Sequence, residues 1–134
     1  MTTITVDYLR EQDACPEQVE LFAETFGQSA ELTRENLIKA AQAGLDTGWL
    51  AKCLLDEDAE LRFYRSLYPA LCHYNAIVGA AHQRHEKIVS ALSGAQRYRF
   101  ERAAYAAFDA VRNAQRRAYD LTVAQTLAGM LELP

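Results

Sequence analysis

The chain has 134 residues, of which half are hydrophobic and 24% are charged, with six glycines and three prolines. This length and composition fit a single domain over residues 1–134 and exclude collagen-like, low-complexity and charge-rich disordered chains. The net charge of −4 is unevenly placed, because residues 1–61 carry thirteen acids and four bases whereas residues 62–134 carry five acids and ten bases. We therefore distinguish an acidic segment of short helices, residues 1–56, from a basic segment, residues 57–134.

The N-terminal residues contain neither the basic stretch nor the apolar stretch of a signal peptide. The longest uncharged stretch, residues 66–83, contains proline, asparagine, glutamine and two histidines, so it is too polar to span a membrane. An odd number of cysteines, three, is not typical of a disulfide-stapled secreted scaffold. We expect a cytoplasmic protein in which these cysteines are reduced thiols.

Short helices are predicted in the acidic segment, each with recognisable end signals. They cover residues 8–12, 16–26, 34–43 and 48–55. Pro16 occupies the first helical position, Thr33 and either Asp46 or Thr47 are N-caps, and Gly44 is a stop. Only residues 2–6 show the alternation of polar and apolar side chains that is typical of a strand. Five residues cannot form a sheet alone.

The basic segment repeats in eleven-residue units that begin at Asp58. The sixth position of each regular unit is Phe63, Tyr74, His85, Phe108 or Tyr119. Eleven residues make three helical turns, so the repeat keeps one stripe on one side of a long helix. A twelve-residue unit around Gly94 interrupts the series. We predict a coiled-coil-like helical hairpin of residues 57–92 and 95–131, with its break near residues 93–94.

Apolar residues spaced by three and four predict the two faces that meet in this hairpin. The first is Phe63, Leu67, Ala70, Tyr74, Ile77, Ala81, His85, Ile88 and Leu92. The second is Phe100, Ala104, Ala107, Val111, Ala114, Ala118 and Leu121. Because the second face is mostly alanine, a neighbouring backbone can approach closely, either from the other arm or from a second copy in a homodimer. Pro69 removes a backbone donor, so we expect the first arm to be kinked or split near Tyr68.

The segment Tyr8-Leu9-Arg10, the run from Ala14-Cys15 through Gln18 and Phe22 to Phe26, and the eleven-residue units resemble small uncharacterised bacteriophage and prophage proteins. Pro69-Ala70 with Tyr74 matches their repeats best, whereas His85 stands in place of the usual aromatic residue. The resemblance implies a phage-type protein acting in a bacterial host. Small phage proteins of this kind often bind a host protein, for instance as inhibitors of a host-defence component such as a CRISPR effector.

Two groups of residues are candidates, one for a metal site and one for a catalytic pair. His82, His85 and Glu86, with His73 upstream, are candidates for a metal site, but zinc needs three or four convergent ligands and His85 falls on the apolar face. Cys72 and His73 are neighbours that point about 100° apart on a helix, unlike a nucleophile and its base. We expect no catalytic residues and no cofactor, so that the protein is not an enzyme.

The best candidate for partner binding is a stripe of tyrosine and arginine in the second arm. Its residues are Tyr98, Arg102, Tyr105, Arg112, Arg116 and Tyr119. Tyrosine and arginine are enriched at interface hot spots, and arginine pairs with carboxylates through two parallel hydrogen bonds. The alternative is that this basic arm packs on acids of the same chain, such as Glu17, Glu20, Glu24, Glu31 and Glu35. A protein partner is favoured over nucleic acid, because the sequence pI is near 5.3.

The sequence therefore predicts an all-α fold, with short N-terminal helices packed against a long C-terminal helical hairpin. The expected function is non-enzymatic binding and inhibition of a host protein. Three alternatives stay open. They are an oligomeric coiled-coil component of a phage particle, a histidine-based metalloprotein, and a mimic of phosphate through the acids of residues 7–35 and 56–60.

Overall fold

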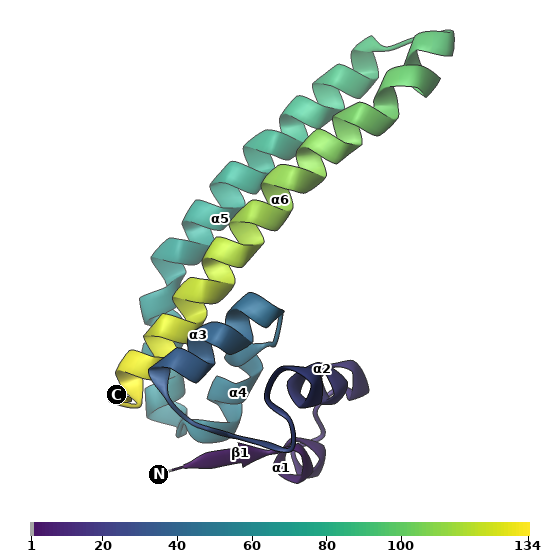
Figure 1. The fold of residues 1–134 in the computed structure, drawn as a ribbon. Helices are drawn as coiled ribbons and strands as arrows, with labels where there is room; N and C mark the ends of the chain where they lie inside the picture. Colours follow the sequence, from purple (N-terminus) through teal and green to yellow (C-terminus); the bar gives the residue numbers. More distant parts are fainter. Residues whose placement is uncertain (1) are drawn as a thin grey trace. The chain divides into compact units, whose positions relative to one another are not determined.

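The computed structural model describes residues 2–134, which form six helices and two short strands (Figure 1). The elements are β1 (Thr3–Thr5), α1 (Val6–Glu11), α2 (Pro16–Phe26), β2 (Ser29–Glu31), α3 (Arg34–Ala43), α4 (Thr47–Leu54), α5 (Glu57–Ala91) and α6 (Gly94–Met130). The all-α prediction is confirmed, since the short N-terminal helices and the two long C-terminal helices account for nearly all of the regular structure.

The ends of the short helices follow from local side-chain chemistry. The Thr33 hydroxyl accepts a hydrogen bond from the Asn36 backbone N–H at 3.2 Å, and the Asp46 carboxylate accepts one from the Trp49 N–H at 2.9 Å. Both bonds satisfy donors that the first helical turn leaves unpaired. Gly44 ends α3 at φ +95°. Glycine adopts this left-handed conformation at little cost in energy because it has no Cβ atom. The predicted caps are confirmed, and Asp46 rather than Thr47 precedes α4.

A small antiparallel sheet joins the N-terminus to the loop between α2 and α3. Ile4 of β1 lies opposite Ala30 of β2, and Ile4 is buried at 5% exposure. The sequence showed strand-like alternation over residues 2–6 only and predicted no sheet. β2 was missed because its three residues alternate in exposure without an apolar pattern that could be recognised, and its pairing is decided by tertiary contacts.

The long helices α5 and α6 form the hairpin that the eleven-residue units predicted. α5 ends at Ala91 and α6 begins at Gly94, whose φ of +54° lies in the left-handed region. Of the kink or split expected near Tyr68, the split does not occur, because α5 continues through Pro69. Within residues 2–134, no helix is both long enough and apolar enough to cross a membrane.

The chain forms two compact units, which we call the core unit, Met1–Tyr68 with Asp120–Pro134, and the hairpin unit, Pro69–Tyr119. The boundaries fall inside α5 and α6, so the units divide the chain at other positions than the segments 1–56 and 57–134. Every buried side chain of the described residues belongs to the core unit, where Phe63 and Leu127 have no exposed surface. The hairpin unit has a half-buried contact face and no fully buried core.

Aromatic rings dominate the contact face of the hairpin unit. The rings of Tyr74 and Tyr119 lie 5.9 Å apart and those of His85 and Phe108 lie 5.8 Å apart, measured between centroids. The two pairs are separated by eleven residues on each helix. The sixth positions of the repeat therefore face one another across the hairpin.

The predicted contact face is confirmed for most of α5 and only in part for α6, where Ala104, Val111 and Leu121 are half-buried as expected. Ala107, Ala114 and Ala118 are exposed, whereas Phe108 and Tyr119 are half-buried, so α6 is turned by about one residue from the expected orientation. An aromatic ring removes far more apolar surface from water than an alanine methyl group does, so the rings decide the register. Near the hairpin end, Ile88 and Phe100 are exposed rather than inward-facing.

Candidate partner-binding surface at the end of the hairpin

The first turns of α6 are exposed to solvent. Every residue from 93 to 103 is exposed, and Ala104 is the first half-buried residue of α6. Among the aromatic contacts between the arms, the one nearest the loop joins His85 to Tyr105 at 6.0 Å. We call residues 94–103 the α6 overhang; in Figure 1 this segment directly follows the loop that joins α5 to α6.

Two aromatic side chains of the α6 overhang are held in solvent. Tyr98 is 91% exposed and Phe100 is 48% exposed. A helix of this length is marginal in water without tertiary contacts. Its local support includes an ion pair between Arg97 and Glu101 at 3.8 Å and the Arg99 guanidinium 5.7 Å from the centroid of the Phe100 ring. Exposed aromatic rings that carry arginine beside them are typical of protein-binding surfaces.

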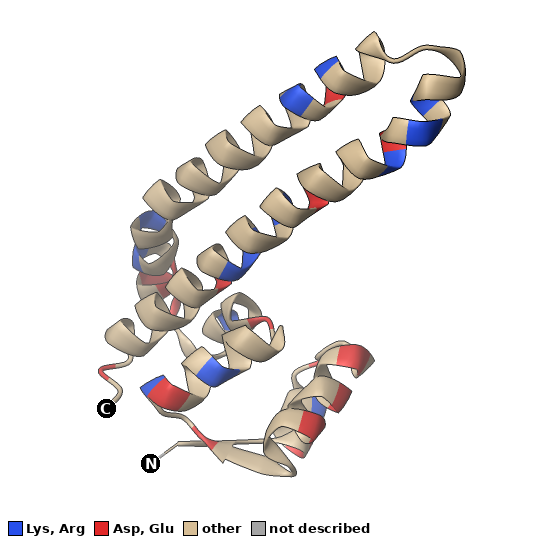
Figure 2. Cartoon of the chain, turned by 45° about the horizontal axis from the view of Figure 1, so that its top comes forward, with Lys and Arg blue, Asp and Glu red and all other residues tan. Residues whose placement is uncertain are grey.

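The charge of the hairpin unit is strongly positive, and Figure 2 shows blue residues gathered around the hairpin end. Residues 69–119 carry eight bases and three acids, a net charge of +5, whereas the core unit carries six bases and fifteen acids, a net charge of −9. Five of the bases belong to the hairpin end, namely Arg84, Lys87, Arg97, Arg99 and Arg102. An acidic surface of a partner is the electrostatic complement of this end.

The six residues predicted as a partner-binding stripe fall into different environments. Tyr98 and Arg102 are one helical turn apart on the α6 overhang, and both are exposed. Tyr105 is 52% exposed, with one edge against His85. Arg112 pairs with Asp109 of its own helix and covers the Phe108 ring, Arg116 is exposed, and Tyr119 packs on Tyr74. The stripe is thus exposed at its start and becomes part of the hairpin contact face at its end.

The histidines considered for metal binding form part of an aromatic cluster. His82 and His85 both contact the Phe108 ring, at 5.6 and 5.8 Å between centroids, and the Nδ1 atom of His85 is buried without a hydrogen-bond partner. His82 lies 3.9 Å from the Glu86 carboxylate, one turn along the same helix. Within residues 2–134, no group of three or more His, Cys, Asp or Glu side chains is placed to hold a metal ion.

The three cysteines are free thiols in different settings. Cys15 and Cys72 are exposed, and Cys53 is half-buried with its thiol 3.6 Å from the Trp49 carbonyl oxygen. Burial raises the pKa of the Cys53 thiol above its ordinary value of 9.0, which lowers the reactive thiolate fraction near neutral pH. Cys72 and His73 are adjacent exposed residues of α5, and their side chains diverge as expected for neighbours on a helix.

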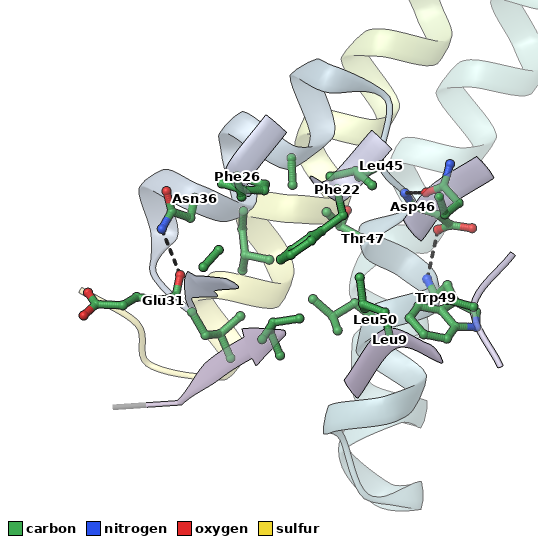
Figure 3. Close-up of a pocket in the computed structure, with 17 residues that line it drawn as sticks. Leu9, Phe22, Phe26, Glu31, Asn36, Leu45, Asp46, Thr47, Trp49 and Leu50 are labelled. Atoms are coloured by element: carbon green, nitrogen blue, oxygen red, sulfur yellow. Dashed lines mark hydrogen bonds between the residues drawn. The ribbon is translucent and has the colours of Figure 1, made fainter. Parts of the chain in front are cut away.

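An apolar pocket lies in the core unit among the short helices and β2 (Figure 3). Leu9, Phe22 and Leu50 line it, and polar groups at its edge are bonded within the protein, including the Asn36 amide that donates to the Glu31 carbonyl oxygen at 2.9 Å. The cavity is about 60 Å³, against roughly 300 Å³ or more for small-molecule sites. It is therefore a gap between core side chains. Phe22 is buried and Phe26 and Trp49 are half-buried, as expected of core residues.

The acids that are candidate phosphate mimics are distributed over the short helices, the segments between them and the start of α5, and Figure 2 shows them in red. Those of residues 7–35 are all exposed, as are Asp56, Glu57 and Asp58, while Glu60 is half-buried. Exposed acids on helix exteriors are ordinary solvated groups. They contribute the negative charge of the core unit and form no separate site.

Sequence reasoning missed two features of the hairpin end, the overhang itself and the exposure of Phe100. Comparison with known protein families, with curated proteins and with solved structures finds no match to this chain.

Proposed function

We infer that the protein acts by binding another protein through the α6 overhang and that it performs no catalysis of its own. The observation that carries this proposal is the exposure of Tyr98 and Phe100 on a helical segment whose residues are all exposed. Burying an aromatic side chain stabilises a complex by about 1.5–3 kcal/mol, and such rings lose little conformational entropy on binding.

The partner surface that fits the overhang is acidic with an apolar recess. Arg97, Arg99 and Arg102 belong to the same turns of α6 as the two aromatic rings, and the hairpin unit carries a net charge of +5. Nucleic acid is a poorer fit, because the whole chain has a net charge of −4 and its core unit would repel phosphate. Arginine forks and a protein carboxylate make the paired hydrogen bonds that give such a contact its orientation.

The biological setting we propose comes from the resemblance to phage and prophage proteins. In that setting the protein lies in the cytoplasm of a bacterial host and inhibits a host protein, such as a defence component of the CRISPR effector type. The loose match of the N-terminal segment and of the eleven-residue units supports this setting. Inhibition then consists of occupying an acidic functional surface of the host protein.

Photo-crosslinking in bacterial cells tests this proposal. A benzoylphenylalanine placed at Tyr98 keeps an aromatic ring at the most exposed position, and the same group at Glu24, an exposed residue of α2, is the control. We expect a discrete protein adduct from position 98 that position 24 does not give. The substitution Arg102→Ala should reduce that adduct at least tenfold, since a buried charged hydrogen bond contributes about 1.5–3 kcal/mol.

Two further variants separate binding from folding. The double variant Tyr98→Ala/Arg102→Ala should keep the helical circular dichroism of the wild type but no longer bind the partner. The control double variant Arg10→Ala/Arg34→Ala, in the core unit, should keep both the helical signal and partner binding. Unfolding of the first variant would show that these residues are internal packing, and the proposal would fail. It would also fail if the adduct at position 98 were destroyed by nuclease, or if position 24 gave the same adduct.

A further inference from the structure

His85 places a titratable ring at an aromatic position of the hairpin. The other sixth positions of the regular eleven-residue units are phenylalanine or tyrosine. His85 is half-buried on α5, and its ring lies 6.0 Å from the Tyr105 ring and 5.8 Å from the Phe108 ring of α6, measured between centroids. A histidine therefore fills a contact between the two arms that phenylalanine and tyrosine rings fill elsewhere in the hairpin.

This contact leaves one polar atom of His85, the ring nitrogen Nδ1, without a partner. The atom is buried, and no group of residues 2–134 forms a hydrogen bond with it. The neutral imidazole ring carries a single proton, which Nε2 can hold, so that Nδ1 remains an unprotonated acceptor. The imidazolium carries a proton on both nitrogens. A protonated His85 would therefore bury a charged donor that has no acceptor, which is far more costly than leaving a neutral nitrogen unpaired.

The turns of α6 that contact His85 do not supply this acceptor. Both carboxylate oxygens of Asp109 already accept hydrogen bonds within α6, from Arg112 and Asn113. The Arg112 guanidinium lies 5.6 Å from the centroid of the Phe108 ring. The ring that could attract an imidazolium thus already has a cation beside it.

The neighbouring turns of α5 add positive rather than negative charge. The Glu86 carboxylate, which follows His85 in sequence, lies 3.9 Å from His82. The other charged or titratable groups in the turns of α5 and α6 around this contact are all exposed, namely Arg84, Lys87, Glu101, Arg102 and Tyr105. Three of these five side chains are basic, so a further positive charge at His85 adds to an existing excess.

We propose that His85 is a pH-sensitive latch of the hairpin: the arms are closed around it while its ring is neutral and separate when the ring takes up a proton. The open hairpin exposes the ring to water, so the open state binds a proton more readily than the closed state. The contact is therefore stable at pH 7.5 and weakens as the pH falls below about 6.5, where a solvated histidine becomes charged.

His82 responds to the same change of pH in the opposite direction. Its protonated ring forms an ion pair with Glu86, which strengthens α5 instead of opening the hairpin. Both side chains are more than half exposed, at 58% and 64%, so the pair contributes little. Because His82 also contacts the Phe108 ring, it is a matched control for His85.

Opening of the latch alters the surface next to the α6 overhang. Tyr105, a member of the predicted partner-binding stripe, loses its contact with His85 when the arms separate. This consequence rests on the proposed function. Opening itself is measured on the free chain, so the latch can fail while partner binding stands, and the reverse.

Amide hydrogen exchange of the full chain at pH 7.5 and pH 5.5 tests the latch, since carboxyl groups with ordinary pKa values near 4 stay ionised over this range. Protection factors, from which the pH dependence of intrinsic exchange has been removed, are compared for residues 80–90 and 102–112 and for α3. Protection in the hairpin should fall by at least about threefold and at most about tenfold at pH 5.5. The amides of α3 should change by less than about twofold.

Substitutions assign the effect to one ring. His85→Phe, which introduces the residue of the Phe63 unit, should remove the pH dependence, and His82→Gln should keep it. If His85→Phe lowers α3 protection at pH 7.5, His85→Tyr, the residue of the Tyr74 unit, takes its place. The proposal is overturned if wild-type protection is equal at both pH values, if α3 loses protection in parallel, if the aromatic variant keeps the pH dependence, or if His82→Gln abolishes it.

Discussion

Replacing Phe108 by alanine should open the hairpin without unfolding the core unit. The Phe108 ring contacts His82 and His85 of α5, at 5.6 and 5.8 Å between centroids, and the Arg112 guanidinium lies 5.6 Å from its centroid. A fully buried phenylalanine replaced by alanine costs about 3–5 kcal/mol. Because Phe108 is only half-buried, we expect a loss of about 2–3 kcal/mol, which raises the population of the open hairpin about 30- to 150-fold.

Amide hydrogen exchange is the suitable assay, because the core and hairpin units need not unfold in one transition. Protection of the amides in residues 77–88 and 104–115 against exchange should fall about 30- to 150-fold. The amides of α3 should keep their wild-type exchange rates. Ala107→Glu, at an exposed neighbouring position, is the control and should change protection by no more than about two- to threefold. If Ala107→Glu lowers protection as much as Phe108→Ala does, the aromatic register of the hairpin is wrong.

Three further predictions concern stability. Asp46→Ala should destabilise the core unit by about 1 kcal/mol in urea titration by removing the bond to the Trp49 N–H, whereas Asp46→Asn should change it by less than half as much. Pro69→Ala should raise the thermal midpoint, because alanine restores a backbone donor inside α5 at an exposed position; a lowered midpoint would mean that the proline fits a required bend. The free energy of unfolding should also fall as the pH rises above about 9. Groups whose pKa is raised in the folded state hold their protons more tightly in the folded protein than in the unfolded chain, so deprotonation favours unfolding. Equal free energies of unfolding at pH 7 and pH 10 would contradict this prediction. Burial is the largest cause of each raised pKa, and the three groups are Tyr8, Cys53 and Tyr64.

Much of the helical organisation could be predicted because local chemistry determines it. Pro16 at a first helical position, the Thr33 and Asp46 caps and the left-handed Gly44 fix the helix ends through bonds and dihedral angles within a few residues. The eleven-residue period likewise determined that residues 57–130 form a hairpin with a break near Gly94. These properties depend on residues within one helix and at its ends, and not on packing against another element.

The contacts between elements depended on tertiary structure. A period of eleven residues shows that Phe63, Tyr74, His85, Phe108 and Tyr119 share a helix side, but not whether that side or the neighbouring alanine side faces the other arm. Burial of the rings decides this, because it removes more apolar surface from water. β2 exists only because β1 lies beside it.

The candidate surfaces show the same division. The order of residues in the sequence places tyrosine and arginine in the second arm of the hairpin and most acids in the N-terminal segment. Tertiary structure then separated Tyr98, left in solvent on the α6 overhang, from Tyr119, which packs against Tyr74. The sequence determined which side chains each helix carries, and the packing of the two arms decided which of them stay exposed, because only the side chains that face the other arm are removed from water.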